Sequence, residues 1–204
     1  MKKIKDLIES TIIIDKSKFI TTLFPVNSIE EIESFLAATK KKYYDATHNC
    51  YAYIFDDGRI QKCSDDGEPS KTAGFPMLDV LKKNDITDVL AVTTRYFGGI
   101  KLGAGGLIRA YSSSVSTALK GAPLYETRLQ TIYEVKIDYS DYSRNIDYWN
   151  SLSITSSSFE VNVVLKIAFY ECDVDDNLEK IKNLTQGKAL INFIENRFID
   201  VICD

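Results

Sequence analysis

What this chain of 204 residues lacks already limits its function. Its only histidine is His48, which excludes any mechanism that needs two imidazole groups. None of its apolar runs approaches the roughly 18 residues required to cross a bilayer, and the start MKKIKDLIES turns polar where a signal peptide would be apolar. The four cysteines include no CxxC pair, so we expect free thiols rather than disulfides. These absences predict a cytoplasmic protein with no membrane partner.

The composition is that of a globular protein with an uneven charge distribution. Hydrophobic residues make up 45% of the chain, enough to bury a core. Residues 1–122 carry 17 Lys and Arg against 15 Asp and Glu, a net charge of +2, whereas residues 123–204 carry 8 against 14, a net charge of −6. The difference indicates that the two halves meet different partners, with a protein partner for the acidic second half.

The first 125 residues alternate strand and helix signals and form the first predicted domain. Ser28 and Glu31 make a capping box, which predicts a helix start, and the lysines at 40–42 suit the carboxyl-terminal end of that helix. Asp57-Gly58 between two apolar runs is a strong hairpin signal. The expected strands cover residues 11–26 (as a hairpin), 49–55, 59–64 and 88–97, and the expected helices cover 28–43, 72–83 and 107–120.

Residues 126–204 form the second predicted domain. This β-α-β-β-α-β order is that of the split ferredoxin-like unit, and the fold class is therefore α+β with two domains. The expected strands cover residues 130–139, 155–159, 162–170 and 189–199, and the expected helices cover 142–152 and 175–185.

The first candidate site is the acidic segment SDDGEPSKTAG at 64–74, which crowds three carboxylates into four residues. Such groups repel one another unless they are solvated, paired with cations or bound to a metal. One interpretation is a helix-entry loop, because a helix dipole favours acids near its amino-terminal end. The other is a polar functional cluster, although no metal-loop spacing is present. The candidates for that cluster are His48, Asp65, Asp66, Glu68 and Thr72.

Two cysteines near His48 raise the hypothesis of a zinc site. Alternation along a strand places His48 and Cys50 on one face, and a two-residue turn at 57–58 would set Ala52 opposite Cys63. Zinc would still need a fourth ligand and a convergent geometry. Buried, inert cysteines are the simpler interpretation. We therefore assign no metal, no cofactor and no catalytic residue.

The third candidate is the glycine-rich segment that follows the strand at 88–97. Free backbone amides at a helix start, together with cations, form an anion site suited to phosphate. A tight turn that requires positive φ would use the same glycines. The spacing matches neither a Walker loop nor the dinucleotide GxGxxG pattern. The predicted anion-binding or nucleic-acid-binding residues are Arg95, Lys101, Gly103, Gly105, Gly106 and Arg109.

Several motifs follow one another between about residues 18 and 119. They are His48-x-Cys50-x-Ala52, SDDGEP at 64–69, Thr72-Ala73-Gly74-x-Pro76, and TRYFGGIKLGAGGLIRAY at 94–111. Together they resemble the signature of the YigZ/IMPACT family. The second half of the chain resembles the second domain of the bacterial YigZ branch by its pattern of elements.

The resemblance implies a ribosomal protein S5 domain 2-like fold for the first domain, shared with elongation factor G domain IV and with small-molecule kinases. It implies a ferredoxin-like second domain similar to elongation factor G domain V. Eukaryotic relatives of the first domain regulate translation through a stress-kinase activator, and bacterial members have been proposed to bind nucleic acid. We see no counterpart of the extra partner-binding module of the eukaryotic proteins, so we do not expect their partner here.

Three functions follow from these observations. The first is a non-enzymatic regulator that binds RNA or the ribosome, with Arg95, Lys101 and Arg109 meeting phosphates. The alternative is an enzyme acting on a phosphorylated or carboxylated small molecule, with the three carboxylates as general base or magnesium ligands. No complete catalytic constellation is visible for it. The third is a protein-docking module.

Overall fold

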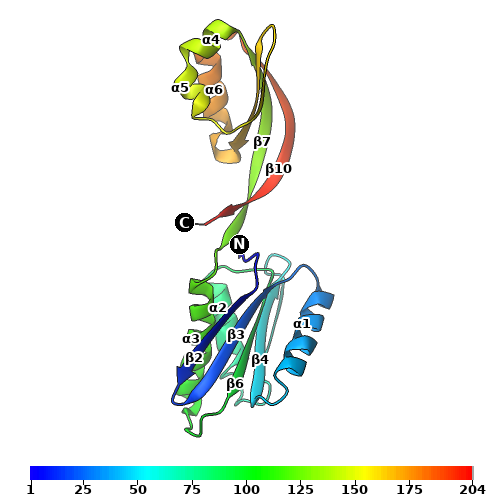
Figure 1. Cartoon of the computed structure of the whole chain (residues 1–204), viewed down its shortest axis with the longest axis vertical. Coiled ribbons are helices and arrows are strands. Elements are labelled where there is room, and N and C mark those ends of the chain that lie inside the picture. The colour runs from blue at the N-terminus through cyan, green and yellow to red at the C-terminus, as the bar shows by residue number, and fades with distance from the viewer. Residues whose placement is uncertain (204) are drawn as a thin grey trace. The chain divides into compact units, whose positions relative to one another are not determined.

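The computed structural model describes residues 1–203 and divides the chain into two compact units. Unit 1 comprises Met1–Glu126 with the carboxyl-terminal residues from Ile202, and unit 2 comprises Thr127–Val201. Both contain a sheet and helices, so the protein is a mixed α/β chain of two units (Figure 1). Within the part of the chain described, no helix combines the length and the apolar character needed to cross a membrane.

Unit 1 is built on a five-stranded antiparallel sheet with the strand order β2-β3-β6-β4-β5. The strands are β2 (Ile8–Ile14), β3 (Ser17–Pro25), β4 (His48–Phe55), β5 (Ile60–Ser64) and β6 (Val89–Tyr96). β6 lies at the centre, and every residue of it except the last is buried. Its carboxyl-terminal end, and with it Arg95, therefore lies deep in the unit rather than on a free edge. A short strand, β1 (Lys2–Lys3), pairs with Tyr125 and Glu126.

Helices cover both faces of this sheet: α1 (Ile29–Lys42), α2 (Gly74–Lys83) and α3 (Gly103–Lys120). α1 packs on one face, where Ile32 joins an apolar cluster with Phe24. α2 and α3 cover the opposite face, where Met77 and Tyr111 belong to the larger core (Figure 1). The two cores hold the sheet as the middle layer of three.

Local signals explain where several elements begin. The Ser28 hydroxyl accepts a hydrogen bond from the backbone N of Glu31 at 3.2 Å, which confirms the predicted helix cap. The Glu31 carboxylate reaches back to the backbone N of Asn27 at 2.8 Å, one residue earlier than in the usual capping box. Asp57 and Gly58 both have positive φ in the turn between β4 and β5, as a two-residue hairpin loop requires.

Two predicted boundaries around the glycines were wrong. The helix expected from residue 72 begins at Gly74, and Pro76 lies in its first turn, where the missing N–H of proline costs little. The glycine-rich loop is shorter than expected, because α3 begins at Gly103. Position 98 in that loop requires glycine for a packing reason, since a Cβ there would collide with the backbone of Lys16.

Unit 2 has the predicted β-α-β-β-α-β order, with the sheet order β10-β7-β9-β8. The elements are β7 (Tyr125–Ile137), α4 (Tyr139–Arg144), α5 (Ile146–Asn150), β8 (Ile154–Phe159), β9 (Val163–Tyr170), the 3-10 helix η1 (Glu171–Asp173), α6 (Val174–Leu184) and β10 (Leu190–Ile202). Its core gathers around Trp149 and Ile167, both fully buried. The helix predicted at 142–152 is thus two short helices separated at Asn145.

Candidate functional site

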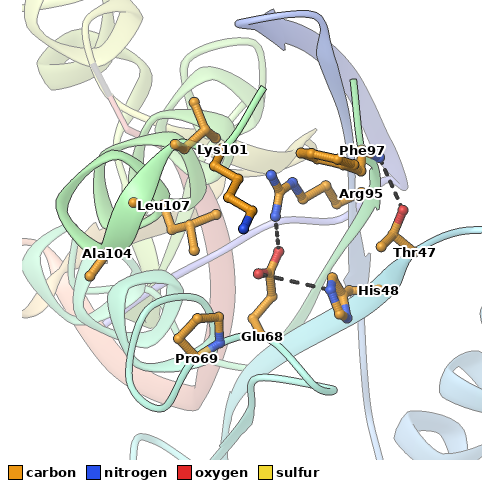
Figure 2. A pocket seen from close by; sticks show the side chains of 11 residues that line it. Thr47, His48, Glu68, Pro69, Arg95, Phe97, Lys101, Ala104 and Leu107 are labelled. Atoms are coloured by element: carbon orange, nitrogen blue, oxygen red, sulfur yellow. Dashed lines mark hydrogen bonds and ion pairs between the residues drawn. The ribbon is translucent and has the colours of Figure 1, made fainter. Parts of the chain in front are cut away.

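A pocket of about 320 Å³ opens in unit 1 where the start of α3 meets the ends of β4 and β6. In Figure 2 the side chains of Lys101, Arg95, Glu68 and His48 point toward one another across it. These residues come from three separate stretches of the chain, so the pocket exists only in the folded unit. The remaining lining residues are Thr47, Pro69, Phe97, Leu102, Gly103, Ala104 and Leu107.

A buried ion pair between Arg95 and Glu68 forms part of the pocket wall. Nη1 of Arg95 donates to Oε1 of Glu68 at 2.5 Å, and both residues are more than nine-tenths buried. The hydroxyl of Tyr111 donates to the same oxygen at 2.8 Å, and Nη2 of Arg95 donates to Oγ of Ser17 at 3.4 Å. Nε of Arg95 is buried with no hydrogen-bond partner among residues 1–203. An unsatisfied buried donor is costly, so this N–H is an unfavourable feature of the site that the other two bonds of the guanidinium offset.

Asp65, the first acid of the segment, caps α2. Its Oδ1 accepts from the backbone N of Ala73 at 3.0 Å and of Gly74 at 2.9 Å. Its Oδ2 accepts from the backbone N of Lys71 at 2.8 Å. Both oxygens therefore hold amides of the helix entry, as the first interpretation of this segment predicted.

The other members of the acidic segment also have separate partners. Asp66 accepts from the backbone N of Asn49 at 2.7 Å and pairs with Lys40 at 3.1 Å. The Thr72 hydroxyl donates to the carbonyl of Pro69 at 2.6 Å and closes the turn before α2. Among the residues described, no group of three or more His, Cys, Asp or Glu could hold a metal ion. Of the three carboxylates only that of Glu68 lines the pocket, so the magnesium-ligand hypothesis gains no support from this geometry.

His48 begins β4 and forms the wall beside Glu68. Its Nδ1 lies 2.8 Å from the carbonyl oxygen of Asp66, and its Nε2 lies 3.9 Å from Oε2 of Glu68. A carbonyl oxygen only accepts hydrogen bonds, so Nδ1 must carry the proton that joins them. The dashed line in Figure 2 joins the imidazole of His48 to the carboxylate of Glu68.

The start of α3 supplies the positive end of the pocket. No side chain in the described chain caps this helix, and its first turn contains no acid. The first amides of a helix lack intrahelical acceptors and carry a partial positive charge. Lys101 is exposed, lines the pocket and forms no ion pair with any other residue in the 1–203 range. Because Glu68 offsets Arg95, Lys101 is the cation that remains uncompensated there.

The structure brings together half of the predicted anion-binding residues. Arg95, Lys101 and Gly103 line the pocket, and Gly103 has a φ of +69° with open space beside its Cα. The other three lie further along α3 and do not line it: Gly105, Gly106 and the exposed Arg109. Starting the helix at Gly103 turns these three onto the helix surface.

Sequence reasoning missed three polar contributors. Thr47 accepts a hydrogen bond from the backbone N of Phe97 at 3.0 Å, which fixes one rim of the pocket. Ser17 lies 78 residues from Arg95 in the chain and gave no local signal. Tyr111 ends the last of the motifs, and the signal overlooked there was its hydroxyl, which needs a partner when buried.

Cys50 lies beneath the pocket as an inert thiol. Its Sγ is 2.9 Å from the carbonyl oxygen of Asp65 and 3.3 Å from the hydroxyl of Tyr111. Burial raises the pKa of the Cys50 thiol to about 12 and also raises the pKa of Tyr111. The thiol is therefore protonated and unreactive near neutral pH. Cys63 pairs in register with Ala52 as predicted, yet the zinc hypothesis gains no support.

The model of the Impact N-terminal domain family matches residues 15–119, about half of the chain and the whole of the pocket. This chain belongs to the IMPACT family. The relative YvyE of Bacillus subtilis (strain 168), an IMPACT family member, is 40% identical over 97% of this chain and 92% of its own length. The IMPACT family member YigZ of Escherichia coli (strain K12) is 32% identical over 89% of this chain and 92% of its own. The family resemblance drawn from the motifs is thus confirmed.

Solved structures are similar to this IMPACT-family chain to different degrees. One described as a hypothetical protein is 30% identical, covers 95% of this chain and 97% of its own, and has a TM-score of 0.59. The two-domain translational regulator Yih1 is 24% identical over 58% of this chain and 46% of its own. Its TM-score of 0.35 is too low to establish a shared fold.

Proposed function

We propose that this protein is a non-enzymatic, translation-related regulator that binds RNA, free or within the ribosome, through a phosphate held at the start of α3. The observation that carries the proposal is the set of donors left without partners in the described pocket. They are the uncapped amides of α3 and the ammonium of Lys101. A phosphate is negatively charged and offers acceptor oxygens, so it complements both.

The apolar part of the pocket supports a nucleotide rather than a bare inorganic anion. Phe97 lines the pocket and is 47% exposed, which leaves an aromatic surface for an unstacked base. Leu102 and Leu107 extend that apolar wall. A cationic helix end beside an aromatic wall is the combination with which proteins hold single-stranded nucleic acid.

Family membership supports the translation-related part of the proposal. The Protein IMPACT homolog of Dictyostelium discoideum is 43% identical over 55% of this chain. The eukaryotic relatives that the motifs resemble regulate translation, and a pocket in the shared part of the chain offers a common point of contact. The acidic residues 123–204 are our candidate surface for a protein partner.

We also assign domain folds on the basis of topology. Unit 2 is assigned to the ferredoxin-like fold, with domain limits near 126–204, because its first and last strands are neighbours in the order β10-β7-β9-β8. Unit 1, near residues 1–125, is assigned to the ribosomal protein S5 domain 2-like fold that the motifs imply. These assignments fit a protein that works with the translation machinery, although fold alone does not determine function.

The test is fluorescence anisotropy with a labelled single-stranded RNA oligonucleotide at several salt concentrations. We expect affinity to fall as salt rises, because binding releases the cations condensed on phosphates. Lys101→Ala should weaken binding and reduce the log–log salt slope by about 0.7, the share of one phosphate contact on a single strand. Lys120→Ala is the matched control, since it removes an exposed lysine from the opposite end of the same helix.

Two outcomes would contradict the proposal. One is RNA binding by Lys101→Ala equal to wild type across the whole salt series. The other is wild-type binding that does not change with salt, since a phosphate contact must depend on it. Circular dichroism of both variants checks that the fold is intact.

A further inference from the structure

His48 gives this donor-rich pocket a hydrogen-bond acceptor. Its Nδ1 is engaged with the carbonyl of Asp66 at 2.8 Å and therefore carries the proton. In a neutral imidazole with the proton on one nitrogen, the other nitrogen accepts. Gly67, with a φ of +90°, lies so close under the ring that a Cβ there would come within 3.3 Å of Nδ1. The backbone thus fixes both the tautomer and the orientation of the ring.

The accepting nitrogen of His48 has no hydrogen-bond partner in the described chain. Its distance to Oε2 of Glu68 is 3.9 Å, beyond hydrogen-bond length, and two acceptors would not bond to each other. The His48 side chain is 21% exposed and lines the pocket, so a group bound there can reach Nε2. A phosphate cannot satisfy this nitrogen in the neutral imidazole, because an ionised phosphate oxygen also only accepts.

A ligand that complements the pocket therefore needs two features. One is an anionic group that accepts hydrogen bonds at the start of α3, and the other is a hydroxyl that donates a hydrogen bond to His48. A ribonucleotide carries both, whereas a deoxyribonucleotide lacks the hydroxyl beside the base. The pocket volume of about 320 Å³ lies at the lower end of the range for small-ligand sites, which suits one nucleotide and excludes a duplex.

We propose that the pocket holds a single unpaired ribonucleotide whose ribose 2′-hydroxyl donates a hydrogen bond to Nε2 of His48, so that the site prefers RNA to DNA. This inference rests on the proposed function and extends its phosphate contact. Phe97 stacks on the base, and Lys101 with the α3 amides holds the phosphate. His48 acts here as a specificity-determining residue and takes part in no bond-breaking step.

The experiment compares labelled oligonucleotides of one sequence that differ only at the 2′ position: hydroxyl, hydrogen and methoxy. We expect wild type to bind the hydroxyl form about two- to tenfold more tightly than the other two, the effect of one hydrogen bond. The methoxy form keeps the ribose oxygen but has lost the donor. Titration with the free mononucleotide UMP separates a strand-bound nucleotide from a free one as the source of the same chemistry.

Two substitutions at His48 separate the acceptor from the structural role of the ring. In His48→Asn the amide nitrogen replaces Nδ1 as donor to Asp66 but leaves no acceptor at the position of Nε2. In His48→Gln the longer side chain returns an amide oxygen near that position. We expect Asn to bind all three oligonucleotides with the same affinity, still dependent on Lys101, and Gln to recover part of the preference. Thermal unfolding shows whether both variants stay folded.

The outcomes of the two proposals are distinguishable. Equal, salt-dependent and Lys101-dependent binding of RNA and DNA by wild type would overturn the role of His48 and leave the proposed function intact. A preference for RNA that persists unchanged in His48→Asn would also overturn it. Absence of salt-dependent binding to any of the oligonucleotides and to UMP would overturn the proposed function itself, and the present inference with it.

Discussion

The acidic segment and the glycine-rich segment meet at the same pocket but treat their polar groups in opposite ways. The carboxylate of Asp65 accepts hydrogen bonds from amides at the start of α2, and the carboxylate of Glu68 pairs with the buried Arg95. The first amides of α3 and the ammonium of Lys101 have no such partners within the described chain. The acidic segment is therefore mainly scaffold, whereas the glycine-rich segment offers its groups to a ligand. Both segments are rich in polar or unusual residues. They differ in whether those polar groups are paired with other groups of the protein.

The largest effect on stability should come from breaking the ion pair between Glu68 and Arg95. Glu68→Ala leaves the guanidinium of Arg95 buried without its counter-charge, which we expect to lower the free energy of unfolding by about 3–5 kcal/mol. Urea denaturation measures the change. Glu33→Ala, at an exposed position of α1, is the control and should change little. Equal stability of the two variants would mean that Glu68 belongs to the ligand-facing group instead.

The second-largest effect on stability should come from removing the cap of α2. Asp65→Ala removes the acceptor of three backbone amides at the start of α2, and we expect a loss of about 1–2 kcal/mol in urea denaturation. Asp65→Asn keeps one side-chain oxygen as acceptor and should lose less. If Asn proved as unstable as Ala, the negative charge would be the stabilising feature rather than the hydrogen bonds.

The thiol beneath the acidic segment predicts a pH dependence. The pKa of Cys50 is raised from 9.0 to about 12 in the folded protein, so the native state keeps a proton that the unfolded state releases. Stability is therefore complete below about pH 9 and falls as pH rises toward 12, by about 1 kcal/mol at pH 10. Denaturation between pH 7 and 10 should show a shallower fall in Cys50→Ala. Cys172→Ala is the control and should stay closer to wild type, because the hydrogen bond to Asp173 that raises the pKa of this exposed thiol is screened by solvent.

The smallest effects on stability should come from substitutions in the glycine-rich segment. Two such substitutions, at Gly103 and Gly105, should change stability in opposite directions. Gly103 has a φ of +69°, so Gly103→Ala should destabilise the protein by about 1 kcal/mol through backbone strain. Gly105 has no positive φ, and the atom nearest to an added Cβ is the flexible end of Arg109 at 3.6 Å. Gly105→Ala should then stabilise α3 by about 0.5–1 kcal/mol. Thermal unfolding compares the two, and the same sign for both would contradict the helix start at Gly103.

Much of the fold was predictable because its signals are local. The cap at Ser28, the turn at Asp57-Gly58 and the order of elements in unit 2 each depend on neighbouring residues. The errors occurred where packing decides a boundary. α3 begins at Gly103, although glycine is a poor helix former and propensity favours a later start. Asn145 likewise separates two short helices, and Tyr142 of the first and Trp149 of the second belong to the same core.

The sequence predicted which residues belong to the candidate site. It did not predict how those residues pair with one another. His48, Glu68, Arg95 and Lys101 were all identified from their motifs, and they meet in one pocket. The role of Arg95 was not predictable, because its pairing with Glu68 crosses 27 residues and its bond to Ser17 crosses 78. Arg109 has the same side chain but lies on the exposed surface of α3.

Residue order along this chain is enough to establish family membership, the succession of strands and helices, and the supply of anions, cations and glycines around the pocket. Only the tertiary structure determines which of those charges neutralise one another and which remain free to bind a ligand. The reason is that ion pairs and buried hydrogen bonds join strands through sheet register and helix packing, and these depend on distant segments that no local pattern specifies. Arg95 and Lys101 are six positions apart, yet the first is neutralised inside the protein and the second faces the pocket unpaired among the described residues.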